Sequence, residues 1–326
     1  MASSTPSASP PAAKEGYPQL STSRPVAAST EGVIPINYTD PPDHTRLRRA
    51  LIKEFTVARV QSLQPMIAAV VDALIDGMLE AGPPLDLQSR FALAVPTSVI
   101  LAMLGIAYDE HGFFHERAGL VVSTNLDSAL ARQAQPDIRA RMREILREKE
   151  KNPEAHDDLM ERLIREQIRP GNLSHEEACS LLQSLVIAGH ETTASIIGLG
   201  MLLLLRNPEI DRRLRDETST KTAEQAVEEM LRYWSTTNFV AFRVALEDVG
   251  FRGVTIRAGE GILPQVVAAN HDPAVFTRLP KRMPTLRLAI PFGEVEFKRG
   301  YLTHGLHALP VTWQADCGST GAEGTR

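Results

Sequence analysis

The chain has 326 residues, 43% hydrophobic and 23% charged, which is enough for one large core or two domains and is typical of a globular protein. A net charge of −5 and an isoelectric point near 6.0 give no reason to expect nucleic acid or an anionic membrane as a partner. The two cysteines, Cys179 and Cys317, form no metal-binding spacing, which favours a reducing, cytoplasmic compartment.

The first residues show few features of a folded segment. Residues 1–30 are rich in Ser, Pro and Ala and contain no continuous apolar core, so they resemble neither a signal peptide nor a membrane anchor. The most apolar run, Ile196–Leu205, is too short to span a bilayer, and we expect no membrane segment. We expect residues 1–39 to be a poorly ordered lead-in, 40–313 the folded domain, and 314–326 a flexible tail.

Helical patterns dominate from residue 40 to residue 206, with no alternating, strand-like run. Asp40 is a good N-cap for a first helix, with Pro41 in its first turn. An amphipathic helix is then predicted over Val57–Glu80, and Ala81-Gly82-Pro83 ends it. The remaining predicted helices are Leu87–Ile106, interrupted at Pro96, and then Arg139–Lys151 and His156–Gln167.

A long apolar helix follows. Ser174 and Glu177 form the capping box that marks its start, and Asn207-Pro208 marks its end. About thirty residues lie between them, roughly 45 Å of helix. Its middle carries a carboxylate and two hydroxyls, which are either hydrogen-bonded locally or retained for chemistry. The zinc-protease motif His-Glu-x-x-His is excluded because Ala194 stands where the second histidine is required.

The middle of this helix reads Ala-Gly-His-Glu-Thr-Thr at positions 188–193. It resembles the oxygen-binding segment of the haem-thiolate monooxygenases, the cytochrome P-450 family, in its soluble bacterial or fungal form. The resemblance implies that Ala188 and Gly189 leave room beside haem b, and that Glu191 and Thr192 are the acid–alcohol pair that relays protons to dioxygen. Taken alone, the pattern favours hydroxyls bonded to the preceding turn and a glutamate paired with a basic neighbour.

Two further segments match the family in the correct order. The segment from Asp40 to Arg49 resembles the helix at the haem edge, which implies that His44 and Arg48, on one helix face, hold a haem propionate. Without the resemblance, it is a solvated basic helix start. The segment Phe242–Val249 implies that Arg243 is the second propionate-binding cation.

The helix Ala223–Trp234 begins with another capping box at Thr222 and contains the family's Glu-x-x-Arg as Glu229 and Arg232. Two interpretations remain open. Helical periodicity predicts that both charged side chains face solvent, whereas the resemblance implies that they lie in the core and stabilise it. The apolar stripe that favours the first interpretation is Val227, Met230, Leu231 and Trp234.

The sequence pattern of the C-terminal part predicts a small β region. Alternation at Val254 and Ile256, followed by Ala258-Gly259, indicates a hairpin. Residues 268–273 and 303–313 resemble family segments, the latter its last strand pair. The resemblance therefore implies a mainly α fold, an incomplete cytochrome P-450 fold with a small β region near the C-terminus.

The family's Phe-x-x-Gly loop, which ends in the cysteine that ligates the haem iron, is absent. Residues 273–276 should lead into it but join, near 277–281, to residues that resemble the segment after it. Cys179 lies roughly 15 Å before Gly189 along the helix, and Cys317 lies in the polar tail. A haem held only by propionate contacts would not activate dioxygen in the family's way.

The resemblance implies insertion of one oxygen atom from O2 into a small organic, secondary-metabolite-like substrate, with electrons from a reductase or ferredoxin. The missing segment raises a second hypothesis, a non-catalytic relative that binds and stabilises a partner enzyme such as a glycosyltransferase. The retained Glu191-Thr192 and Glu229-x-x-Arg232 favour an origin in a monooxygenase gene.

Overall fold

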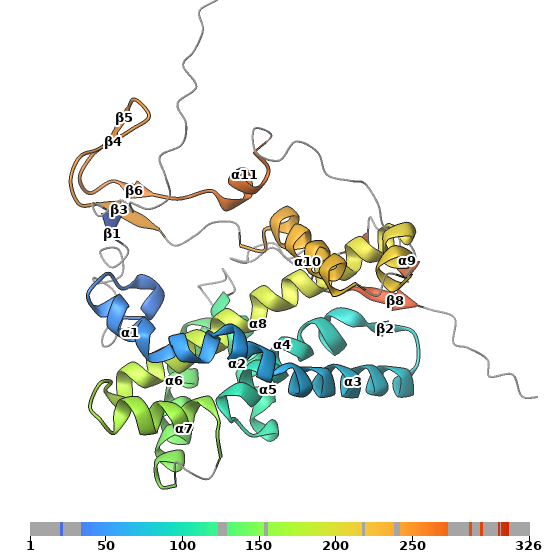
Figure 1. Cartoon of the computed structure of the whole chain (residues 1–326), viewed down its shortest axis with the longest axis horizontal. Helices are drawn as coiled ribbons and strands as arrows, with labels where there is room; N and C mark the ends of the chain where they lie inside the picture. The colour runs from blue at the N-terminus through green and yellow to red at the C-terminus, as the bar shows by residue number, and fades with distance from the viewer. Residues whose placement is uncertain are drawn as a thin grey trace, which may run out of the picture.

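The computed structural model describes residues 20–21, 34–122, 129–152, 156–216, 219–237, 242–272, 287–288, 294–295, 306 and 308–312. These residues form a mainly helical protein with a few short strands, which confirms the predicted fold class (Figure 1). The expected lead-in, tail and junction near 277–281 lie almost wholly outside the described residues, so the proposed domain limits stay predictions.

The helices follow one another closely along the first three quarters of the chain. They are α1 Asp43–Leu51, α2 Val57–Ser62, α3 Gln64–Ala81, α4 Ala94–Leu104, α5 His111–Val122, α6 Ala129–Glu150, α7 Leu159–Leu163, α8 His175–Arg206, α9 Pro208–Asp216, α10 Thr220–Trp234 and α11 Val266–Asn270. Short 3-10 or π turns connect several of them, at Ile36–Tyr38, Ile52–Phe55, Gln88–Ala92, Tyr108–Glu110 and Ile164–Ile168.

The main core forms around α8, which runs diagonally through the molecule (Figure 1). Helices α4, α5 and α6 all pack against it. Fully buried side chains come from α5 at Phe114, from α6 at Ile138 and Met142, and from α8 at Leu182. Removing this apolar surface from water drives the packing, at roughly 1.5–3 kcal/mol for each fully buried large side chain.

The ends of α8 agree with the sequence. The Ser174 hydroxyl accepts from the Glu177 amide at 3.2 Å, and the Glu177 carboxylate accepts from the Ser174 amide at 2.8 Å, so the capping box is confirmed. The helix ends at Arg206, before Pro208. It is the one helix of the described residues that is long and apolar enough to cross a membrane, and half of its most apolar window is buried inside the protein, as in a core helix.

Several predicted helix limits were wrong. Helix α1 begins at Asp43, not after Asp40, and Pro42 precedes it without a side-chain cap. The predicted helix over 57–80 is two helices that meet at Leu63, because Pro65 has no amide hydrogen to continue the ladder and its ring crowds the carbonyl four residues earlier. The predicted helix over 156–167 starts later, with Asp158 as its N-cap.

Two other helix signals were misplaced. The break predicted at Pro96 occurs at Leu93 instead, after a π turn, because Pro96 lies in the first turn of α4, where no intrahelical bond needs its missing amide hydrogen. The capping box predicted at Thr222 is also wrong. Helix α10 already begins at Thr220, with Ser219 before it, so Thr222 stands inside the first turn.

The strands are short and antiparallel. One sheet has the order β1 (Leu20–Ser21), β3 (Arg243–Ala245), β6 (Gly261–Ile262), and another has the order β2 (Leu85–Asp86), β8 (Pro310–Thr312), β7 (Arg287–Leu288). Strand β2 was not predicted from the sequence. It recruits the C-terminal strand to the helical half, and the Asp86 carboxylate accepts from the Leu309 amide at 2.8 Å.

Strands β4 (Val249–Phe251) and β5 (Val254–Ile256) form a separate two-stranded hairpin. A hairpin at Val254 and Ile256 was expected, but its turn is Arg252-Gly253, before the strand, rather than Ala258-Gly259 after it. Arg252 and Gly253 have φ values of 49° and 82°, the positive angles that a two-residue turn of the right twist requires.

Candidate functional site

The centre of α8 presents two different faces. Glu191 is buried, with 2% of its surface exposed, whereas Ala188 and Thr193 are exposed. The hydroxyl of Thr192 donates to the Ala188 carbonyl, one turn back, at 2.7 Å. This is the local hydrogen bond that the pattern alone favours. The Thr192 oxygen keeps a lone pair that can still accept a hydrogen bond.

Buried Glu191 lies beside a histidine pair that sequence reasoning did not identify. His190 Nε2 lies 2.9 Å from His115 Nδ1 on α5, and the two rings meet edge to face with centroids 5.0 Å apart. Glu191 Oε2 is 3.7 Å from His190 Nδ1. The basic neighbour expected for Glu191 therefore includes the adjacent histidine. Nothing in the sequence distinguishes His115 from other histidines, because its partner is 75 residues away.

Gly189 lies where α8 meets α4. A Cβ on Gly189 would stand 3.3 Å from Cγ1 of Ile100, closer than most side-chain contacts. The glycine therefore lets the two helices approach closely. Helix packing alone explains why a glycine stands at this position, without a ligand beside it. The role of Gly189 and Ala188 beside a cofactor stays a prediction.

The three cations assigned to propionates lie on two elements. His44, half-buried, and Arg48, exposed, are one turn apart on α1. Arg243, half-buried, opens β3 and donates to the Phe242 carbonyl at 3.2 Å. Between the two α1 residues, Arg46 donates to the Asn172 carbonyl at 3.2 Å and pairs with Glu177, which anchors α1 to the start of α8.

Of the Glu-x-x-Arg pair, Arg232 is more enclosed than helical periodicity indicates, whereas the Glu229 side chain is 41% exposed. Arg232 donates to both carboxylate oxygens of Glu229, at 2.8 and 2.9 Å, and also to the Asn270 carbonyl at the end of α11. Its side chain is only 12% exposed. Val227 and Leu231, expected on the buried stripe, are instead 52% and 40% exposed. The solvent-facing interpretation of Arg232 was therefore wrong.

The reason is that α10 packs on α8 and α11 through a different part of its surface. On α8, a Cβ at Gly200 would stand 3.2 Å from the sulfur of Met230, so this glycine provides the space that Met230 fills. A helix with apolar residues on more than one side buries the side that its neighbours cover, and the pattern does not reveal which side that is.

Comparisons with known proteins agree with these motifs. The family model "Cytochrome P450" matches residues 123–282. Cytochrome P450 CYP105Q4 of Mycobacterium marinum is 37% identical over 84% of this chain and 75% of its own length. Pentalenic acid synthase of Streptomyces avermitilis is 36% identical over 84% of this chain and 76% of its own. The chain belongs to the cytochrome P450 family.

Solved structures of P450s show the same fold. The crystal structure of GfsF is similar with a TM-score of 0.78 and 33% identity, covering 86% of this chain and 80% of that one. Mycinamicin VIII C21 methyl hydroxylase MycCI from Micromonospora griseorubida gives a TM-score of 0.82 with 28% identity, covering 91% and 86%. This P450 chain thus retains most of the family fold, while about a quarter of the length of its curated relatives has no counterpart in it.

Haem b is the cofactor of P450s, and its iron needs a thiolate in this family. Cys179 lies in the helical core with no exposed surface, and burial raises the pKa of its thiol to about 11. Core side chains enclose its sulfur, so it does not face a space that a haem could occupy. Cys317 lies outside the described residues, and no group of three His, Cys, Asp or Glu within the described ranges could hold a metal ion. The described residues therefore do not fit a haem-thiolate centre.

Proposed function

We propose that this chain is the scaffold of a monooxygenase for a small, secondary-metabolite-like molecule, and that it does not activate dioxygen by itself because it lacks the axial thiolate. The names of two relatives, pentalenic acid synthase and a mycinamicin methyl hydroxylase, support a substrate of this class. Bacterial P450s receive electrons from a ferredoxin or a reductase. The free thiol of Cys179 agrees with a reducing, cytoplasmic compartment.

The environment of Cys179 carries the proposal. It is the one cysteine of the described residues, and its side chain packs among the core residues of α6 and α8 instead of facing the open side of α8. Bringing it to a bound haem would require α8 to rotate or unfold locally, which would expose buried apolar side chains such as Leu182.

Other residues keep the roles that the family motifs give them. We assign Glu191 and Thr192 to proton handling, because one is buried beside His190 and the other has its hydroxyl fixed on a backbone carbonyl. We assign Glu229 and Arg232 to bracing α10 against α11. The cations that would hold a haem through its propionates are His44, Arg48 and Arg243.

The test is the absorption spectrum of the purified chain with added haem, reduced under carbon monoxide. We expect no red-shifted Soret band of a thiolate-bound complex. The variants Cys179→Ala and Cys317→Ala are measured in parallel. A red-shifted band in the unmodified chain that one of these variants removes would identify an axial ligand and overturn the proposal.

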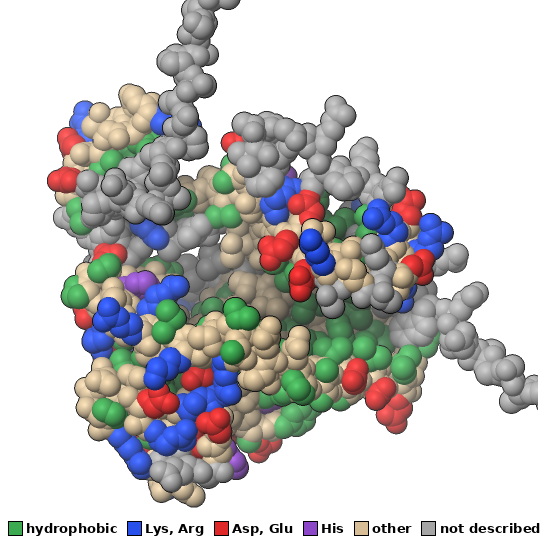
Figure 2. Space-filling model, in the orientation of Figure 1, with side chains coloured by type: hydrophobic (Ala, Val, Ile, Leu, Met, Phe, Trp, Pro, Cys, Tyr) green, Lys and Arg blue, Asp and Glu red, His purple; other side chains and the backbone are tan. Residues whose placement is uncertain are grey.

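One observation favours the alternative, a helper protein that binds a partner enzyme. Four large apolar residues within a stretch of nine are exposed, each with 47% to 75% of its surface accessible to solvent: Ile52, Phe55, Val57 and Val60. Hydrophobic and basic side chains lie together over the part of the surface where α1 and α2 lie (Figure 2). Large apolar side chains that are exposed close together in this way are a feature of protein interaction sites.

If the chain is a helper, it raises the melting temperature of its partner enzyme, and added haem does not change that effect. Phe55→Asp together with Val57→Asp should then abolish the stabilisation, whereas Tyr108→Asp, a change at an exposed aromatic residue elsewhere, should leave it intact. A stabilisation that survives the double substitution would exclude this surface from partner binding.

A further inference from the structure

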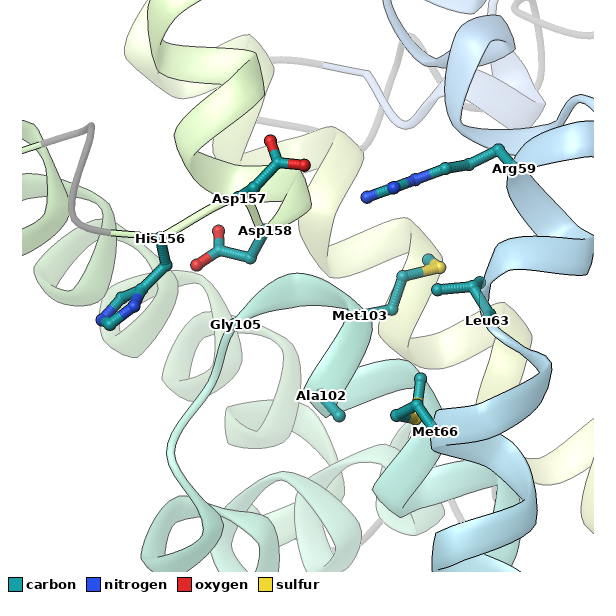
Figure 3. A pocket seen from close by; sticks show the side chains of 9 residues that line it. All are labelled: Arg59, Leu63, Met66, Ala102, Met103, Gly105, His156, Asp157 and Asp158. Carbon is teal, nitrogen blue, oxygen red and sulfur yellow. The ribbon is translucent and has the colours of Figure 1, made fainter.

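A cavity of about 370 Å³ lies away from the centre of α8, where α2 and α3 meet the end of α4 and the segment before α7 (Figure 3). Its size is within the range of small-molecule sites. The motifs of the family do not include the residues that line it. Four of these are apolar, three are charged, and the other two are a glycine and a histidine: Leu63, Met66, Ala102, Met103, Arg59, Asp157, Asp158, Gly105 and His156.

The apolar side chains gather on one side of the cavity. Leu63 joins α2 to α3, Met66 lies in the first turn of α3, and Met103 lies in the last turn of α4 (Figure 3). Methionine side chains are flexible and polarizable, so they adapt to the shape of an apolar group. This side of the cavity therefore suits a small aliphatic or aromatic substituent.

The charged side chains face one another across the opening. Arg59 extends from α2 toward the carboxylates of Asp157 and Asp158 (Figure 3). Arg59 also contacts Glu54, with 3.6 Å between Nε and the carboxylate oxygen. No ion pair joins Arg59 to Asp157, although both are described residues. A ligand that carries both charges can therefore bridge them.

The two carboxylates are not equivalent. Asp158 is committed to the structure, because it caps α7 by accepting from the Glu161 amide at 3.0 Å and pairs with Lys149 at 2.6 Å. The Asp157 side chain is 70% exposed, and its Oδ1 pairs with Arg162 at 3.1 Å and with Arg165 at 3.3 Å, which leaves Oδ2 for a ligand. The Arg162 hydrogen bond, with the charge of Arg59 as a smaller cause, lowers the pKa of Asp157, so its carboxylate is ionised at neutral pH.

We propose that this cavity binds a small zwitterion of the amino-acid type with an apolar side chain. The ligand carboxylate lies on the guanidinium of Arg59, whose planar fork matches a carboxylate. The ammonium lies toward Asp157, and the side chain contacts Met66 and Met103. A ligand with one charge would bring that charge close to a like charge on the opposite wall, which disfavours simple anions and simple cations. The proposal does not depend on haem or on the proposed function.

The test is a calorimetric titration of the full chain with three matched probes: L-leucine, leucinamide, which lacks the carboxylate, and N-acetyl-L-leucine, which lacks the ammonium. We expect saturable binding of leucine and about tenfold weaker binding of each of the other two, since each loses one charged contact. Equal affinity for all three probes, or no saturable binding of leucine, overturns the proposal.

Variants then assign the charges. Asp157→Asn should bind leucine and N-acetyl-leucine with similar affinity and should still bind leucine more tightly than leucinamide. Arg59→Met should bind leucine and leucinamide with similar affinity and should still bind leucine more tightly than N-acetyl-leucine. Asp76→Asn and Arg213→Met, the same changes at exposed positions on α3 and α9, serve as controls and should bind as the unmodified chain does. Melting curves establish that each variant is folded. A folded Arg59→Met variant that still distinguishes leucine from leucinamide would remove Arg59 from the site.

Discussion

Replacement of Gly105 by alanine is expected to destabilise the fold strongly. Gly105 ends α4 with a φ of 73°, in the left-handed region that disfavours residues with a Cβ. An added Cβ would overlap the carboxylate of Asp158 and stand 2.7 Å from its Cβ (Figure 3). Because the overlap includes the base of the side chain, a rotation of the carboxylate alone does not relieve it.

The magnitude follows from what must move. The left-handed backbone costs about 1–2 kcal/mol for alanine. Displacing Asp158 removes the cap of α7, about 1 kcal/mol, and weakens its ion pair with Lys149, in which both side chains are nearly buried, by about 1 kcal/mol. We therefore expect Gly105→Ala to lower the free energy of unfolding by roughly 3–4 kcal/mol.

Equilibrium urea unfolding of Gly105→Ala, Asp158→Ala and the double variant measures this directly. In the Asp158→Ala background the overlap with the carboxylate is removed and only the 2.7 Å contact between the two Cβ atoms remains, so the added cost should fall from about 3–4 kcal/mol toward the backbone contribution of about 1–2 kcal/mol. Gly77→Ala, within α3 and with no atom within 4 Å of the added Cβ, is the control and should stabilise by about 0.5–1 kcal/mol. The same cost of Gly105→Ala in both backgrounds would refute the reasoning.

Three further outcomes can be measured. Burial raises the pKa of the Cys179 thiol to about 11, so the contribution of the neutral thiol to stability is complete below the ordinary thiol pKa near 9 and is lost as the pH rises toward 11. Urea unfolding at several pH values should show this fall in the free energy of unfolding. The Cys179→Ala variant should not show it. Arg232→Ala removes the hydrogen bonds to Glu229 and Asn270 and should lower the free energy of unfolding by about 2 kcal/mol in the same assay. Arg232→Lys should have a stability between those of the unmodified chain and Arg232→Ala. The hydrogen bond from Arg46 lowers the pKa of Glu177, so this stabilisation is present above pH about 4.5 and is lost below it; Glu177→Gln should reduce the acid dependence of the melting temperature.

Local chemistry in the sequence determined the helical framework. Ser174 and Glu177 placed the start of α8 because a capping box satisfies amides within four residues, and Pro208 placed its end because proline has no amide hydrogen. The motif at positions 188–193 and the other matching segments identified the family, because they occur in this chain in the same order as in members of the family. All these signals act over a few residues and need no knowledge of the neighbours in space.

Tertiary packing decided what those local signals could not. Periodicity placed Leu231 inside and Arg232 outside, yet α8 and α11 cover a different side of α10 and enclose the arginine. The histidine pair of His115 and His190 arises only because α5 crosses α8. The cavity likewise requires Arg59 and Asp157, almost a hundred positions apart, to stand on opposing walls. Burial and charge pairing depend on which surfaces meet, and surfaces that meet across long stretches of sequence leave no local pattern.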